Sequence, residues 1–291
     1  MSGLALALIV FSALMHAVWN LLVKRSSDKT VFIWWMFVCS GSLLNLLVWL
    51  QTGQLPRPPL ATLVLALGAA CSFVAYHWCN GVAYSRGDLS LAYPLSQTSM
   101  IYTPLWAVLL LGEQLRPGGI VGILLVLVGA YAVQLPDLTR ANLLRPLRNL
   151  GQPAVRAALL AGLIYSVGVV LDKLGITSYS PLYFTQLLVT VMLALMTLNL
   201  LRPCYRGRVL ACLRRDGRLI ALSGPVMLGS FLSFRYGLSL APVSYAVPVR
   251  QVSLLFGVLF GVLFLHESCG RIRFGAALLI LVGVCFIRLG G

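Results

Sequence analysis

Two arginines lie inside long apolar stretches of this chain, where charged side chains are rare. Arg235 and Arg250 each stand about 7–10 Å from the nearer end of their stretch, at about 1.5 Å per helical residue. Arginine stays charged and binds carboxylate or phosphate through a fork of donors. We place Asp172, Glu113 and Glu267 at helix ends, so no carboxylate is expected deep enough to pair with the arginines. The two arginines predict a cavity that attracts anions. The open alternative is that their side chains reach lipid phosphates at the membrane interface.

A second group of polar residues lies in the first apolar stretch. His16, Trp19 and Asn20 follow an i, i+3, i+4 spacing, which puts them on one face of a helix. This face could wall a cavity in which Trp19 stacks on a solute and Asn20 hydrogen-bonds it. The alternative is helix packing, because His and Asn also bond across membrane helices.

The third apolar stretch carries a similar stripe. His77, Asn80 and Tyr84 share one face, next to Tyr76, and Trp78 is expected to face lipid. Two histidines without a third ligand are weak evidence for a metal, so no metal site is predicted. Polar groups in a membrane usually face the bundle interior or a wet cavity.

Prolines and glutamines recur together in two further stretches. Tyr93, Pro94 and Gln97 stand in one, and Pro248 and Gln251 in the other. Proline removes a backbone donor and kinks a helix, which frees carbonyl groups that can face a solute. The matched residues predict paired walls of one site, unless the kinks serve packing alone.

These matches belong to an internal repeat with a constant offset of 154 residues. Pro94 falls on Pro248, Gln97 on Gln251, Ser99 on Ser253, Glu113 on Glu267, and Gly129 on Gly283. The two glutamates end their apolar segments at tight turns, and we interpret them as structural corners that bond the N-terminus of the next helix. The sequence is therefore two copies of one unit.

Composition shows what kind of unit repeats. Of 291 residues, 59% are hydrophobic and only 10% are charged, and about 20 apolar residues suffice to cross a bilayer. Ten such runs occur, at 3–23, 31–50, 61–84, 89–111, 117–135, 155–175, 181–201, 219–240, 243–265 and 272–289. The predicted fold is an all-α integral membrane protein of ten transmembrane helices in two inverted five-helix repeats, 1–135 and 155–291, joined by a connecting loop at 136–154.

The net charge of +15 is distributed by loop. Sixteen of the 22 Lys and Arg residues fall in loops after the odd-numbered runs, and four fall on the other side. By the positive-inside rule, the odd loops are cytoplasmic and both termini are outside. This explanation of the charge makes nucleic acid an unexpected partner.

These features resemble the drug/metabolite transporter superfamily, and its EamA branch most of all. The resemblance rests on the two repeats, the His-Ala-x-Trp-Asn face from His16 to Asn20 followed by Lys24, and the corners at Glu113 and Glu267. It implies ten helices around a central cavity, and export or exchange of metabolites such as amino acids, sugar nucleotides or triose phosphates. The His-Ala-x-Trp-Asn start is also similar to members associated with phosphonate use. Small multidrug relatives keep a carboxylate in the first helix, and this chain has none there.

The expected function is alternating-access transport of a small polar metabolite, anionic or zwitterionic, in the bacterial inner membrane. Alternatives are a lipid-linked carrier or flippase and, less favoured, a non-transporting accessory protein. The chain shows no catalytic set and implies no cofactor, so it is not expected to be an enzyme. Its expected partners are a small-molecule solute, membrane lipids and, as an option, a second copy of itself. The candidate site residues are His16, Trp19, Asn20, Tyr76, Asn80, Tyr93, Gln97, Tyr165, Arg235, Arg250 and Gln251.

Overall fold

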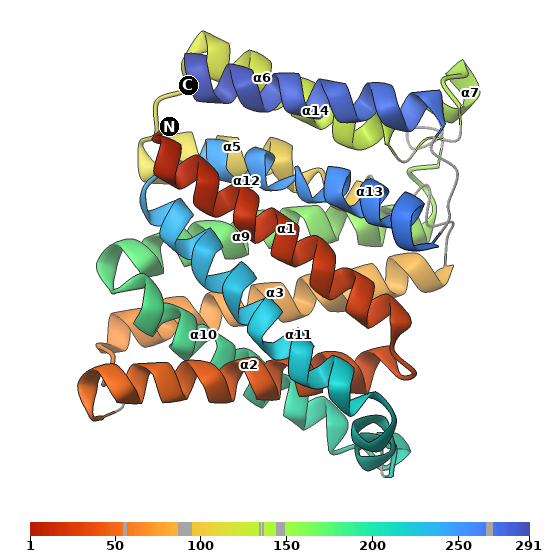
Figure 1. Ribbon diagram of the computed structural model, residues 1–291. Helices are drawn as coiled ribbons and strands as arrows, with labels where there is room; N and C mark the ends of the chain where they lie inside the picture. Colours follow the sequence, from red (N-terminus) through yellow and green to blue (C-terminus); the bar gives the residue numbers. More distant parts are fainter. Residues whose placement is uncertain are drawn as a thin grey trace.

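Long apolar helices lying alongside one another make up the fold in the computed structural model (Figure 1). The structure describes residues 1–54, 57–86, 95–133, 135, 137–143, 149–205, 207–265 and 270–291. Within these ranges, eight helical segments are long and apolar enough to cross a membrane, and the apolar helices at Ser99–Leu111 and Pro117–Ala132 are shorter. This confirms the predicted all-helical membrane fold.

The helices follow the order of the predicted runs. The first unit contains α1 (Gly3–Arg25), α2 (Lys29–Thr52), α3 (Leu60–Arg86), α5 (Ser99–Leu111) and α6 (Pro117–Ala132), and α7 (Arg140–Leu143) lies in the connection. The second contains α9 (Pro153–Ser178), α10 (Pro181–Leu200), the short η1 (Pro203–Tyr205), α11 (Arg208–Ser239), α12 (Val243–Arg250), α13 (Ser253–Leu265) and α14 (Arg271–Gly290).

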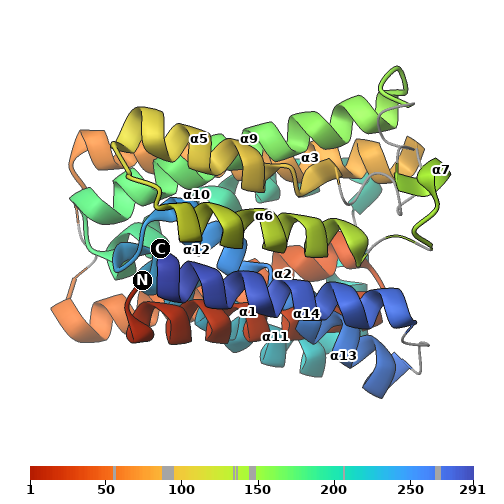
Figure 2. The same cartoon turned by 90° about the horizontal axis from the view of Figure 1, so that it is seen from above.

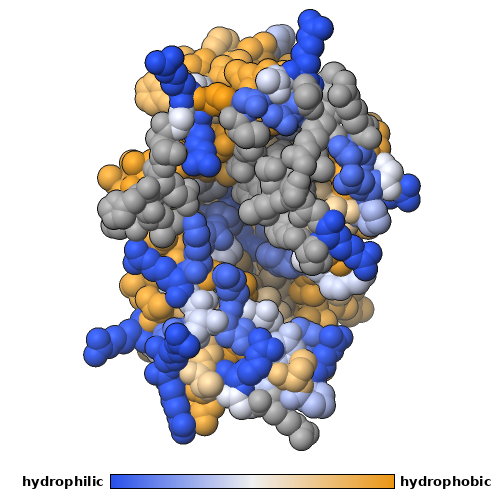
Figure 3. Space-filling view, turned by 90° about the vertical axis from the view of Figure 1, so that its right-hand side faces the viewer, coloured by the Kyte–Doolittle hydropathy of each residue, from blue (hydrophilic) through white to orange (hydrophobic). Residues whose placement is uncertain are grey.

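The two units run in opposite directions. Helix α1 starts at the end of the bundle that holds both termini, whereas α9, its counterpart, starts at the opposite end beside α7 (Figures 1 and 2). The C-terminal ends of α1, α3 and α6 therefore lie at the α7 end, together with the N-terminus of α11. Figure 3 shows many hydrophilic side chains on the α7 end.

Glycines let the last helices of the two units pack closely. Helices α6 and α14 lie against each other along one edge of the bundle (Figure 1). A Cβ atom added at Gly122 would stand 2.6 Å from the carbonyl oxygen of Gly283, and one added at Gly283 would stand 2.7 Å from that of Gly122. Small residues at such a crossing allow the backbones to meet, which membrane helices use in place of a hydrophobic driving force.

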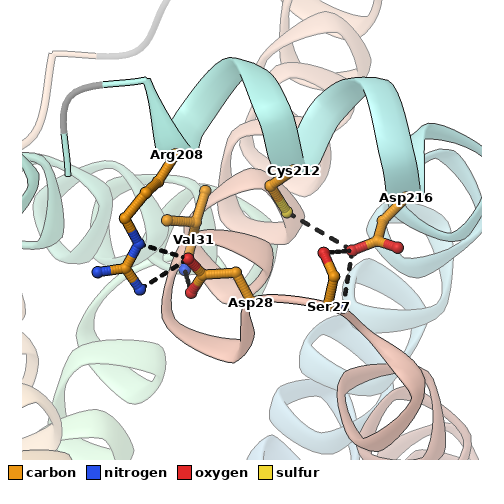
Figure 4. A network of polar contacts seen from close by, with 6 residues as sticks. All are labelled: Ser27, Asp28, Val31, Arg208, Cys212 and Asp216. Atoms are coloured by element: carbon orange, nitrogen blue, oxygen red, sulfur yellow. Dashed lines mark hydrogen bonds and ion pairs between the residues drawn. The ribbon is translucent and has the colours of Figure 1, made fainter.

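The N-terminal part of α11 differs from expectation. The corresponding apolar run was predicted to begin at residue 219, but α11 begins at Arg208. The connection between α1 and α2 holds this extension in place (Figure 4). Arg208 pairs with Asp28 at 2.7 Å, and the carboxylate of Asp216 accepts hydrogen bonds from the backbone N–H and hydroxyl of Ser27 at 2.9 and 2.6 Å. These bonds stabilise helical structure beyond the apolar run, where hydropathy gives no signal.

Candidate functional site

The polar face of α1 forms one wall of the candidate site. The rings of His16 and Trp19 meet edge to face with their centroids 4.8 Å apart. His16 Nδ1 and Trp19 Nε1 are buried and have no hydrogen-bond partner within the described part of the chain. Asn20 is exposed, and its side-chain amide donates to the carbonyl of His16 at 2.9 Å. The shared face predicted from the spacing is present, and two of its polar atoms are available to a ligand.

Helices α3 and α9 supply further candidate residues. The rings of Tyr76 and Tyr165 lie 5.0 Å apart, which joins the two helices. Asn80 is buried, and its Oδ1 has no partner among the described residues. His77 lies within electrostatic reach of His16 on α1. Trp78 is 72% exposed and points outward, as expected for a lipid-facing residue.

The two repeat-related glutamines lie at helix breaks and contact each other. Gln97 stands in a turn just before α5, and Gln251 stands in the turn between α12 and α13. The Nε2 of Gln251 donates to the Oε1 of Gln97 at 3.0 Å. A residue that contacts its own counterpart must lie beside the axis that relates the two units. The predicted single span 243–265 is thus two helices, and the break follows Pro248. Tyr93, another candidate, lies outside the described residues.

Arg250 lies at the end of α12, beside this break. Its guanidinium stacks over the ring of Phe234, 4.1 Å from the centroid. Its Nε is buried without a hydrogen-bond partner in the described part of the chain. Its charge acts on His16 and on Asp172. A buried donor on a charged group is costly to leave unmatched, so Arg250 is suited to binding an anion.

Arg235 does not match the expectation that both arginines lack a carboxylate partner. Its Nε donates to Oδ1 of Asp172 at 2.8 Å, and the two residues are only 4% and 1% exposed. Asp172 was placed at a helix end, but α9 continues to Ser178, which leaves this carboxylate about 9 Å inside at about 1.5 Å per residue. Arg235 is therefore ion-paired rather than reaching for lipid. The signal available in the sequence was that one acid and one arginine lie in two apolar runs; that these runs face each other is known only from the structure.

The end of the bundle that holds the termini has polar contacts within the second unit, made by Lys173, and between the two units, made by Glu113. The Nζ of Lys173 donates to the carbonyls of Leu238 and Ala241 at 2.6 and 2.9 Å. The carboxylate of Glu113 accepts from the backbone N–H groups of Val243 and Ser244 at 2.7 and 3.1 Å, and from the Ser244 hydroxyl at 2.6 Å. Glu113 is a structural corner, as predicted, but the helix that it caps is α12 of the other unit, not the next helix in the chain.

The opposite end is hollowed. Figure 3 looks onto the α7 end and shows a recess near its middle, with hydrophilic residues at its floor. Among the described residues, buried polar atoms without a partner come from α1, α3, α5 and α12. The α5 atom, Oγ1 of Thr103, was missed by sequence reasoning. A threonine in an apolar helix normally satisfies its hydroxyl on its own backbone, so it gives no distinctive signal.

Together these features define an integral membrane protein of two inverted helical units with polar groups between them. The model of the EamA-like transporter family matches residues 3–135 and 152–289. The chain belongs to this family, whose members are membrane transporters of the drug/metabolite type.

One solved structure, titled "Crystal structure of protein", is similar with a TM-score of 0.75 and 18% sequence identity, and the match covers 99% of this chain and 98% of that one. At this identity the likeness shows the fold alone. No curated protein matches the chain.

Proposed function

We propose that this protein is a secondary transporter of a small polar metabolite that is anionic or zwitterionic. The observation that carries the proposal is the set of buried atoms on His16, Trp19, Asn80 and Arg250 that have no partner in the described part of the chain. Leaving a buried polar atom unpaired costs about 1–3 kcal/mol, and more for a charged group. Such atoms on three helices are suited to a solute that supplies the missing partners.

Each candidate residue has a role in this proposal. Arg250 binds the acidic group of the solute through its guanidinium. Aromatic rings cover the apolar part of the solute, and amides fix its orientation. The aromatic residues are Trp19, Tyr76 and Tyr165, with Tyr93 proposed from the sequence alone, and the amides are Asn20, Asn80, Gln97 and Gln251. Arg235 acts through its pair with Asp172.

Transport follows the alternating-access scheme of inverted repeats, in which the two units, residues 1–135 and 155–291, rock about a site between them. The contacts of Glu113 with α12 hold the two units together at one end, and the recess of Figure 3 lies at the other. In the opposite state the two ends exchange roles. The excess of cations supports an orientation in a bacterial inner membrane in which the α7 end is cytoplasmic and both termini are outside.

A ligand screen followed by transport assays tests the proposal. Purified protein is screened by thermal shift against metabolites, phosphonates included, because a bound solute raises the unfolding temperature. The best solute is then measured in proteoliposomes. Arg250→Ala is expected to lower its transport at least about thirtyfold, since truncating one member of a buried charge pair costs about 2–5 kcal/mol.

Arg57 supplies the matched control. It is an exposed arginine outside the site, so Arg57→Ala removes the same charge and leaves transport unchanged. Equal transport by wild type and Arg250→Ala would remove Arg250 from the site. A screen in which no anion or zwitterion stabilises the protein would contradict the substrate class.

A further inference from the structure

The buried pair of Asp172 and Arg235 adds no net charge beside the proposed solute site, because its two charges cancel. Its side chains are buried, and it joins α9 to α11. Arg250 stacks over Phe234, the neighbour of Arg235 in α11, at 4.1 Å from the ring centroid, and it acts electrostatically on Asp172, so the three groups form one cluster. Two positive charges and one negative charge leave a net charge of +1. The neighbouring Lys173 and Glu113 interact with each other and are held by backbone groups, so they add no net charge.

The cluster separates the two arginines by function. The Nε of Arg235 is taken by Asp172, and its Nη1 lies 3.5 Å from the carbonyl of Phe231. The Nε of Arg250 has no partner within the described residues. Replacing a buried ion pair by apolar residues is often neutral or stabilising, so stability is a weak reason for a chain to hold one. With an arginine at 235, the carboxylate of Asp172 keeps the charge of that arginine from adding to the charge of Arg250.

Charge then discriminates between solutes. The attraction of a solute to the site grows in proportion to its charge, whereas the cost of removing the solute from water grows with the square of its charge. A site with a net charge of +1 compensates one anionic group and leaves a second one poorly compensated.

We propose that Asp172 is a specificity-determining residue, which neutralises Arg235 and so makes the site select solutes with one anionic group over solutes with two. This inference rests on the proposed function and narrows its substrate class. The preferred solutes would be monocarboxylates, amino acids and monoanionic phosphonates. Dicarboxylates and dianionic phosphate esters would bind less well.

The test compares two anions of similar size on variants that differ in net charge. Sulfate carries two charges and methyl sulfate one, and both keep them across the working pH range. Their Kd values are measured by calorimetry on the full-length purified protein. Asp172→Asn raises the cluster to +2, Arg235→Gln lowers it to zero, and the double variant Asp172→Asn/Arg235→Gln returns it to +1.

Wild type is expected to prefer methyl sulfate. The preference for sulfate is expected to rise at least about tenfold in Asp172→Asn, to fall in Arg235→Gln, and to return to within about threefold of wild type in the double variant. The matched control is Asp28→Asn, which breaks the ion pair with Arg208 at the α7 end. It is expected to leave the ratio of the Kd values for sulfate and methyl sulfate unchanged.

A structural role for the pair predicts a different pattern, in which all three variants weaken both anions alike and the double variant rescues nothing. That result overturns the inference, and so does a ratio of the two Kd values that does not follow the net charge of the cluster. The proposed function still holds in either case if wild type binds the anions and transports its solute. If Asp172→Asn does not fold, the comparison of Arg235→Gln with the double variant still separates zero from +1. Failure of both anions to bind wild type contradicts the anion site itself, and with it the inference.

Discussion

Glu113 offers the sharpest test of how the two units are held together. Its carboxylate accepts three hydrogen bonds at the N-terminus of α12, two from backbone N–H groups and one from the hydroxyl of Ser244. Glu113→Gln keeps the shape of the side chain but removes its charge. It also replaces one carboxylate oxygen, an acceptor, by an NH₂ group, a donor that would face the N–H and O–H donors of α12. Hydrogen bonds to a charged group contribute about 1.5–3 kcal/mol each, and a charge at a helix N-terminus adds about 0.3–1 kcal/mol.

We therefore expect Glu113→Gln to lower the free energy of unfolding by about 2–4 kcal/mol, because the amide retains part of the bonding. The Tm should fall by roughly 5–15 °C, at about 2–4 °C per kcal/mol for a chain of this size. The assay is thermal unfolding of the detergent-purified protein. Gln114→Ala, next to Glu113 and exposed, is the matched control and should leave the Tm unchanged.

A double-mutant cycle with Ser244→Ala isolates the contact. Because the two side chains share a 2.6 Å hydrogen bond, the coupling energy between Glu113→Gln and Ser244→Ala should reach about 1 kcal/mol. Purely additive effects, together with a Tm unchanged by Glu113→Gln, would refute the reasoning that this carboxylate fastens one unit to the other.

Two further predictions concern packing and orientation. Gly122→Ala should destabilise the protein by about 1–3 kcal/mol because its Cβ meets the backbone of α14. The control Gly257→Ala has open space around its Cβ and should be neutral or slightly stabilising. Equal Tm values for the two variants would contradict the close crossing of α6 and α14. A cysteine placed at Gly291, in a background from which the accessible native cysteines have been removed, should react with a membrane-impermeant reagent in intact cells, since the termini are proposed to lie outside; labelling only after cell lysis would reverse the orientation.

Some of the candidate site follows from the sequence because it depends on local spacing. The face of His16 and Trp19 was predicted correctly, since residues three apart share a helix face whatever the helix packs against. The offset of 154 residues matched Gln97 with Gln251, and the two side chains are hydrogen-bonded in the structure. The pairing of Arg235 with Asp172 was not predicted, because it depends on which helices are neighbours and on how far α9 extends.

The sequence by itself determined that this is a duplicated helical membrane protein, because hydrophobic length, repeat spacing and loop charge are properties of the chain read in order. Only the tertiary structure decided which of its charges remain unpaired. Arg250 and Arg235 look equivalent in the sequence, yet the Nε of Arg235 donates to a carboxylate, whereas the Nε of Arg250 has no hydrogen-bond partner within the described residues. The reason is physical: the state of a buried charge depends on atoms within a few ångströms, and for these residues those atoms come from helices far away in the sequence.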